Sequence, residues 1–139
     1  MPKPPPASPD WTAAGAPTLA DIEAIGNAAY LSIPAALRKQ VDPVVILVVD
    51  FPDDETLDEM GCETPFDLLG LYQGVSIDRK SVTHTPGDVD RIFLYRRPLL
   101  DYWCESGEEL GALVRHVLIH EIGHHFGYSD ADIEAIDNE

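Results

Sequence analysis

Apolar and polar residues alternate along the chain with two periods, one typical of helices and one typical of strands. Thr18 precedes a run of helical spacing and predicts the N-cap of a helix over residues 20–30, and a second, short helix follows over residues 34–38. Residues 44–51 form a continuous β-branched run, VVILVVDF, which is typical of a strand covered on both faces. The acidic stretch over residues 52–69 predicts a surface excursion with a helical turn or two.

Two further extended segments complete the predicted sheet. Residues 70–77, GLYQGVSI, contain two glycines and the polar residues Gln73 and Ser76, which favour an edge strand over a central one. After a turn-rich loop, residues 89–96 predict a third strand. We expect residues 102–104 to lie in a short connection to the last element.

The longest helical pattern lies near the C-terminal end of the sequence. Ser106 and Glu109 have the spacing of a capping box, S-x-x-E, directly before the periodic run LGALVRHVLIHEIGHH. Gly127 is placed to end this helix, because glycine adopts the left-handed conformation without steric cost. The order helix, strand, strand, strand, long helix predicts an α+β domain with a small mixed β-sheet of three to four strands.

The length and the proline distribution predict one folded domain behind a tail. A chain of 139 residues suits a single domain with a modest core. Five of the twelve prolines lie within the first nine residues, and proline-rich polar sequence cannot pack a core. We therefore expect residues 1–16 to form a flexible tail and residues 17–139 to form the domain.

The charge of the chain limits its partners. Lys and Arg number 9 whereas Asp and Glu number 25, so the formal net charge is −16. We expect neither nucleic acid nor a membrane as a partner, because both present negative charge. Residues 1–10 lack the apolar stretch of a secretory signal, and no apolar run approaches the roughly 20 residues of a membrane helix. These features predict a cytoplasmic protein in which Cys62 and Cys104 are free thiols.

The segment HEIGHHFGYSD, residues 120–130, carries the pattern H-E-x-x-H at His120, Glu121 and His124. Residues four apart share one face of a helix, so both imidazoles can reach one zinc ion at about 2.0–2.1 Å. Glu121 is turned by about 100° from His120, so it faces the same cleft without having to bind the metal. There it can accept a proton from a metal-bound water. The three residues continue an apolar stripe of the helix, at positions that should otherwise have stayed apolar.

A catalytic zinc ion needs a third protein ligand and one position open to water. Gly127 can reverse the chain and bring Asp130 back toward the two histidines as a carboxylate ligand. In the alternative interpretation, Ser129 or Asp130 caps a short final helix, DADIEAI, and the same oxygens cannot easily do both. His116 is interpreted as a buried or boundary histidine, and His125 as a structural one.

The segment HEIGHHFGYSD resembles the extended zincin pattern H-E-x-x-H-x-x-G-x-x-H/D, with Asp130 at the third-ligand position. It is most similar to the small bacterial zincin-like metallopeptidase family, which has a minimal zincin fold. The stretches GLYQGVS and RIFLYRRPLLDYW also resemble that family. The resemblance implies a Zn²⁺ site formed by His120, His124 and Asp130, with Glu121 as the general base of peptide-bond hydrolysis. The methionine turn of the larger metzincins is missing, because both methionines precede the motif.

This hypothesis gives each part of the site a role. Zinc lowers the pKa of its bound water to near 7 and polarises the scissile carbonyl, and Glu121 transfers the water proton to the leaving amine. The strand at residues 71–77 can pair with an extended peptide or protein substrate. Two alternatives stay open. One is a zinc-stabilised binding module with little turnover, closed by a fourth ligand such as Cys104 or another histidine. The other is a different metal-dependent hydrolase, for example a nuclease, which the net charge of −16 disfavours.

Overall fold

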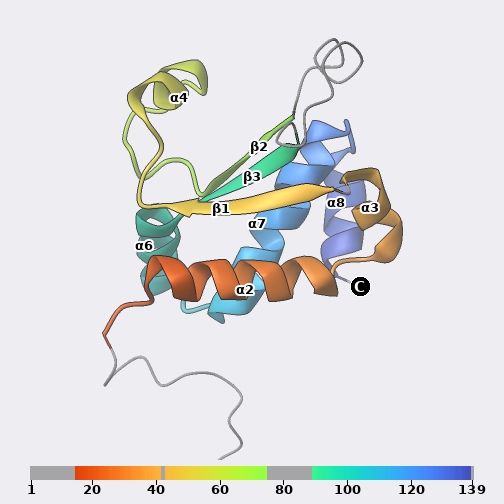
Figure 1. Ribbon diagram of the computed structural model, residues 1–139, viewed down its shortest axis with the longest axis horizontal. Coiled ribbons are helices and arrows are strands. Elements are labelled where there is room, and N and C mark those ends of the chain that lie inside the picture. Colours follow the sequence, from red (N-terminus) through yellow and green to blue (C-terminus); the bar gives the residue numbers. More distant parts are fainter. Residues whose placement is uncertain (1–14, 42, 75–88, 139) are drawn as a thin grey trace, which may run out of the picture.

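The computed structural model describes residues 15–41, 43–74 and 89–138 (Figure 1). In these ranges the helices are α2 (Leu19–Ser32), α3 (Ala35–Val41), α4 (Asp54–Glu59), α6 (Arg96–Ser106), α7 (Leu110–His125) and α8 (Asp130–Asp137), and the strands are β1 (Val44–Val49), β2 (Gly70–Gln73) and β3 (Asp90–Tyr95). This composition confirms the α+β class. Residues 1–14 of the expected tail and residues 75–77 of the expected second strand lie outside the described residues.

The three strands form a mixed sheet in the order β1-β3-β2. β3 runs parallel to β1, with Val44 opposite Asp90, and antiparallel to β2, with Gly70 opposite Leu94. The prediction of an edge position for β2 is therefore confirmed. The prediction that the 44–51 run is covered on both faces is wrong, because Val45 and Val49 of β1 are 42% and 38% exposed. A continuous apolar run does not reveal whether another layer packs on each face of its strand.

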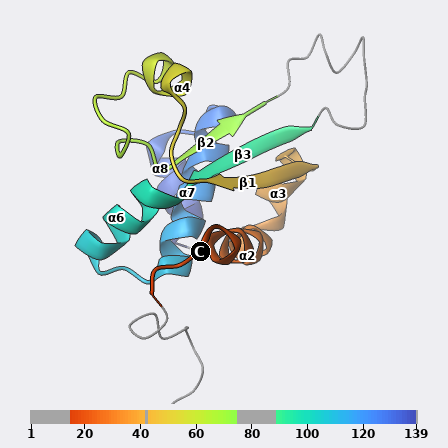
Figure 2. The same cartoon turned by 60° about the vertical axis from the view of Figure 1, so that its left-hand side comes forward.

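The core lies on one face of the sheet, between the strands and two helices. α2 contacts β1, α7 contacts β2, and the two helices contact each other, so both cover the same face (Figure 1). Ile92 and Leu94 of β3 and Ile122 of α7 are completely buried there. α2 begins as expected: the Thr18 side chain accepts a hydrogen bond from the Asp21 backbone amide at 3.1 Å. α4 stands on the other side of the sheet (Figure 2).

The segment between β3 and α7 differs from the expectation of a short connection. It forms the eleven-residue helix α6, whose third residue is Pro98, and proline is tolerated in a first turn because no backbone donor is needed there. Ser106 ends this helix, and Gly107 follows with a φ of 71°. The expected capping box is therefore wrong. Glu109 itself caps α7, since its carboxylate accepts hydrogen bonds from the Gly111 and Ala112 amides.

The end of α7 is fixed by Gly127, as predicted. Its φ is 77°, and the Tyr128 amide donates to the Gly123 carbonyl at 2.8 Å, the pattern of a Schellman motif. The chain then reverses into α8, which packs on α7. The helices approach closely at Gly123, where an added Cβ would lie only 2.6 Å from Ile133 Cγ1. This close approach returns the carboxylates of α8 to the histidines of α7. None of the helices in the described ranges has the length and apolar character required to cross a bilayer.

Candidate metal centre

Three histidines, His116, His120 and His124, stand one turn apart on α7. The ring centroids of His116 and His120 are 4.0 Å apart, and those of His120 and His124 are 5.8 Å apart with perpendicular planes. The rings border a cavity of about 270 Å³, called the α7 cavity below. Its lining comprises Asp67, Leu68, Leu69, Gly70, His116, Val117, His120, Glu121 and His124. The cavity therefore collects all three residues of the H-E-x-x-H motif.

Glu121 is held in this cavity by the edge of the sheet. Its Oε1 accepts a hydrogen bond from the Tyr72 backbone amide at 3.1 Å. The Leu69 carbonyl accepts a hydrogen bond from the Tyr95 amide, so the backbone of Leu69 faces β3. The backbone groups of successive residues in an antiparallel strand point to opposite sides, so Tyr72, three residues on, directs its amide away from β3. Burial raises the pKa of Glu121, while the Tyr72 amide and the nearby His124 oppose the rise. The motif carboxylate is thus anchored through one oxygen and partly desolvated.

Tyr72 is itself fixed on both sides. Its hydroxyl donates to Asp90 Oδ2 at 2.6 Å, and its ring stacks on His125 with centroids 3.9 Å apart. Gly74 leaves room for His125, because a Cβ there would lie 2.9 Å from the ring. Desolvation by burial, together with the bond to Asp90, raises the pKa of Tyr72, so its hydroxyl stays protonated and continues to donate. His125 has the structural position that the sequence indicated, since it braces the strand that anchors Glu121.

The first carboxylate of α8 lies beside the last motif histidine. Asp130 Oδ1 is 3.4 Å from His124 Nε2, and the Asp130 side chain is 97% exposed. The capping role falls to Ser129, whose hydroxyl accepts from the Asp132 amide at 3.1 Å. Of the two capping residues that the sequence offered, Ser129 is therefore confirmed and Asp130 is not. The Asp130 carboxylate stays available to a ligand.

The second carboxylate, at the far end of α8, lies with the other two histidines. Asp137 Oδ2 contacts His116 Nδ1, and Arg115 Nη1 donates to the Asp137 carbonyl at 3.0 Å. Ligand atoms of His116, His120 and Asp137 all lie within 4.8 Å of one another. Burial and the neighbouring His116 lower the pKa of His120, which keeps its ring in the neutral form that binds metals. The structure thus groups His120 with this end of α8.

Sequence reasoning missed part of this arrangement. Asp137 was not considered, and His116 was interpreted as a boundary residue although the structure places it in the group that can hold a metal. The available signal was the repeat His116, His120, His124 at four-residue spacing, followed by acidic residues at both ends of DADIEAID. That repeat alone could not show how α8 returns along α7.

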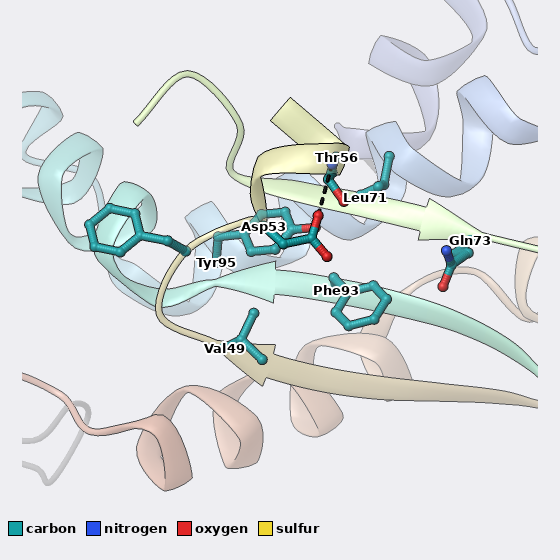
Figure 3. Close-up of a pocket in the computed structure, with 8 residues that line it drawn as sticks. Val49, Asp53, Thr56, Leu71, Gln73, Phe93 and Tyr95 are labelled. Carbon is teal, nitrogen blue, oxygen red and sulfur yellow. Dashed lines mark hydrogen bonds between the residues drawn. The ribbon is translucent and has the colours of Figure 1, made fainter. Parts of the chain in front are cut away.

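A second pocket lies on the opposite face of the sheet (Figure 3). Val49, Leu71, Phe93 and Tyr95 contribute to its lining, together with residues of the segment that leads into α4. Its one carboxylate, Asp53, already accepts a hydrogen bond from the Thr56 amide at 2.8 Å (Figure 3), and bonds from Thr56 lower the pKa of Asp53. No imidazole lines this pocket among the described residues, so the metal-binding chemistry is concentrated in the α7 cavity.

The donor atoms at the α7 cavity fit a zinc ion. Imidazole nitrogen and carboxylate oxygen are among the ligands that zinc takes in proteins, and a set of two imidazoles and one carboxylate leaves a fourth position open. Among the described residues, the ligand atoms of His116, His120 and Asp137 form such a set, which includes neither cysteine, whereas those of His120, His124 and Asp130 are not gathered into one.

Comparison with known families agrees with this geometry. The profile of the family described as "Zincin-like metallopeptidase" matches residues 41–139, which include the whole sheet, α7 and α8. No curated protein matches the chain significantly. The family match covers well over half of the sequence, and the chain belongs to the zincin-like metallopeptidase family.

Proposed function

We propose that the protein is a zinc-dependent peptidase in which His120, His124 and Asp130 hold the metal and Glu121 is the general base. The observation that carries this proposal is the anchored Glu121 carboxylate, which lies in one cavity with both motif imidazoles. The available carboxylate of Asp130 beside His124 supports the third-ligand role. Membership of the metallopeptidase family supports the reaction class.

The chain's own residues supply the proton transfer. A zinc ion bound here would provide Lewis-acid polarisation and a water of lowered pKa. Glu121 takes up the proton of the attacking water and delivers it to the leaving amine. Its raised pKa favours this exchange, because a carboxylate closer to neutral pH both accepts and returns a proton readily. The Tyr72 amide keeps the carboxylate from turning away from the cavity.

The edge of the sheet supports a peptide as the substrate. β2 is an edge strand, and by its register Gly70 directs its backbone amide and carbonyl away from β3, as does Tyr72 its carbonyl, while the Tyr72 amide is already bonded to Glu121. An extended peptide can add to such an edge through main-chain hydrogen bonds, which requires no particular side chain. Gly70 also lines the α7 cavity, so a peptide paired there would pass the proposed metal position.

The alternatives have weaker support. A zinc-stabilised binding module would need a fourth protein ligand; Cys104 is an exposed residue of α6 outside the α7 cavity, and His116, which lines the cavity, lies with Asp137 rather than with Asp130. A metal-dependent nuclease would need cations to receive phosphate, whereas the residues described as lining the cavity include Asp67 and Glu121 and neither Lys nor Arg. The negative lining favours a peptide over a nucleic acid.

The variant Glu121→Gln tests the proposal. It keeps the size of the side chain and an oxygen for the Tyr72 amide but removes the base, so turnover of a peptide library should fall by about 10²–10⁴-fold. Zinc stoichiometry, measured by metal analysis, should stay unchanged. The matched control is Glu134→Gln, an equal change on the exposed face of α8, which should leave turnover intact. Undiminished turnover of Glu121→Gln would remove this residue from the mechanism.

A further inference from the structure

We propose that His116, His120 and Asp137 form a second divalent-cation site, which shares His120 with the proposed catalytic set and competes with it for one metal ion. This inference rests on the proposed function, because the catalytic set is defined there. One ion would then partition between an active position near Asp130 and an inactive position near Asp137. The chemical class of ligand is a borderline divalent cation such as Zn²⁺, which accepts both imidazole and carboxylate.

The geometry of the second set is already close to that of a metal site. Ligand atoms on His116, His120 and Asp137 lie within 4.8 Å of one another, and the first two rings are 4.0 Å apart. Around a tetrahedral zinc ion with bonds of about 2 Å, ligand atoms are separated by about 3.3 Å. Small rotations of side chains that stand on two packed helices would close that difference.

The sharing of His120 makes the two positions mutually exclusive. A neutral imidazole has one nitrogen with a free lone pair, and its other nitrogen carries the proton. His120 can therefore bind one cation at a time. In the structure it lies with His116 and Asp137, whereas His124 lies with Asp130, so the shared ring must move for the catalytic set to form.

The two positions differ in what surrounds the metal. The guanidinium of Arg115 lies 3.4 Å from Asp137 Oδ1, and its positive charge weakens the binding of a metal cation to this carboxylate. The other oxygen, Oδ2, faces His116. Glu121 is anchored to β2 and does not belong to the second set. Because Glu121 lines the same cavity as His116 and His120, the inactivity of the second position would follow from the displacement of the ion from His124 toward Asp137, which takes the bound water away from the Glu121 carboxylate.

Three matched variants on one helix test this inference: His116→Ala, His120→Ala and His124→Ala. Zinc binding is measured by titration calorimetry, and Co²⁺ binding by its visible absorption. We expect one equivalent in the natural chain. His116→Ala and His124→Ala should each keep one equivalent, with different Co²⁺ spectra, because each leaves one complete set. His120→Ala belongs to both sets and should weaken binding by at least about 100-fold.

Aspartate variants in the His124→Ala background show whether the zinc that remains bound is held by Asp137 of the second set or by Asp130. There, Asp137→Asn should weaken zinc binding by at least about tenfold, while Asp130→Asn should leave it unchanged. The inference is overturned if His124→Ala binds zinc as weakly as His120→Ala, or if the natural chain binds two equivalents. It is also overturned if Asp130→Asn, rather than Asp137→Asn, removes the remaining binding. Circular dichroism of each variant verifies that the fold is retained.

Activity then distinguishes the two proposals. His116→Ala removes the competing position, so at limiting zinc its turnover per protein should exceed that of the natural chain. If His116→Ala binds one zinc ion but hydrolyses no peptide, the proposed function fails while the metal titrations still decide on the second site. If it hydrolyses peptide but His124→Ala binds no zinc, the second site fails and the proposed function stands.

Discussion

The two ends of the α7–α8 helix pair carry similar side chains in different surroundings. At one end the Asp130 carboxylate is 97% exposed and lies 3.4 Å from His124. At the other end the Asp137 side chain is 21% exposed and is engaged by both Arg115 and His116. The same residue types therefore have protein partners at one end, with which a metal ion would have to compete, and are exposed at the other. The partners of a carboxylate, more than its identity, decide which role it has.

Both ends depend on the close contact of the helices at Gly123, so the largest effect should follow from Gly123→Ala. The new Cβ would lie 2.6 Å from Ile133 Cγ1, which is completely buried and cannot move aside freely. We expect a loss of roughly 1–3 kcal/mol in the free energy of unfolding, measured in urea. Zinc affinity should fall as well, because both carboxylates move with α8.

Gly111→Ala, in the same helix, is the control. The three atoms nearest to a Cβ there all belong to the flexible side chain of Glu109, at 3.1–3.5 Å, which caps α7 and can shift its carboxylate. The free energy of unfolding should be unchanged or raised by up to about 1 kcal/mol, since alanine favours the helix. Equal destabilisation by the two variants would show that the Gly123–Ile133 contact does not control the position of α8.

A smaller effect, confined to one end, is expected for Ser129→Ala. The Ser129 hydroxyl caps α8 through the Asp132 amide, and loss of such a cap costs about 1 kcal/mol. The start of α8 should fray, so zinc affinity should fall although no ligand has changed. Amide hydrogen exchange should increase at residues 130–132 more than at residues 135–137. Uniform exchange along α8 would contradict this interpretation.

The predictable parts of this site are those determined by local sequence. The H-E-x-x-H spacing fixed the relation of His120, Glu121 and His124 because it depends only on the helical repeat. Gly127 was identifiable as the helix end because a positive φ favours glycine there. The family resemblance seen in the same residues agrees with the match over residues 41–139.

The parts that were missed depend on contacts between distant segments. The exposure of Val45 and Val49 on one face of β1 depends on which segments pack over the sheet, which the composition of residues 44–49 does not encode. The anchoring of Glu121 by the Tyr72 amide joins residues 49 positions apart. The role of Asp137 requires α8 to fold back along α7. Each of these features is set by packing, so spacing along one element cannot reveal it.

The smallest effect on stability provides the sharpest contrast between the two ends. Asp130→Asn should change the free energy of unfolding by less than about 0.5 kcal/mol, because an exposed side chain contributes little. Asp137→Asn should lower it by roughly 0.2–1 kcal/mol, since it weakens the contacts with Arg115 and His116. For peptide turnover at saturating zinc the order should reverse, because the proposed catalytic set needs Asp130 and not Asp137.

Urea unfolding of the metal-free proteins and peptide turnover of the zinc-saturated ones measure the two halves of this pattern, and zinc titration of the folded proteins adds their affinities. If Asp130→Asn were the more destabilising change and left zinc affinity intact, the carboxylate beside His124 would be structural, and the catalytic set would have to be completed by another residue. If both variants lost zinc affinity equally, the metal would occupy both positions to a similar extent. The two aspartates therefore report separately on fold and ligand because the helix pair gives one of them partners and leaves the other exposed.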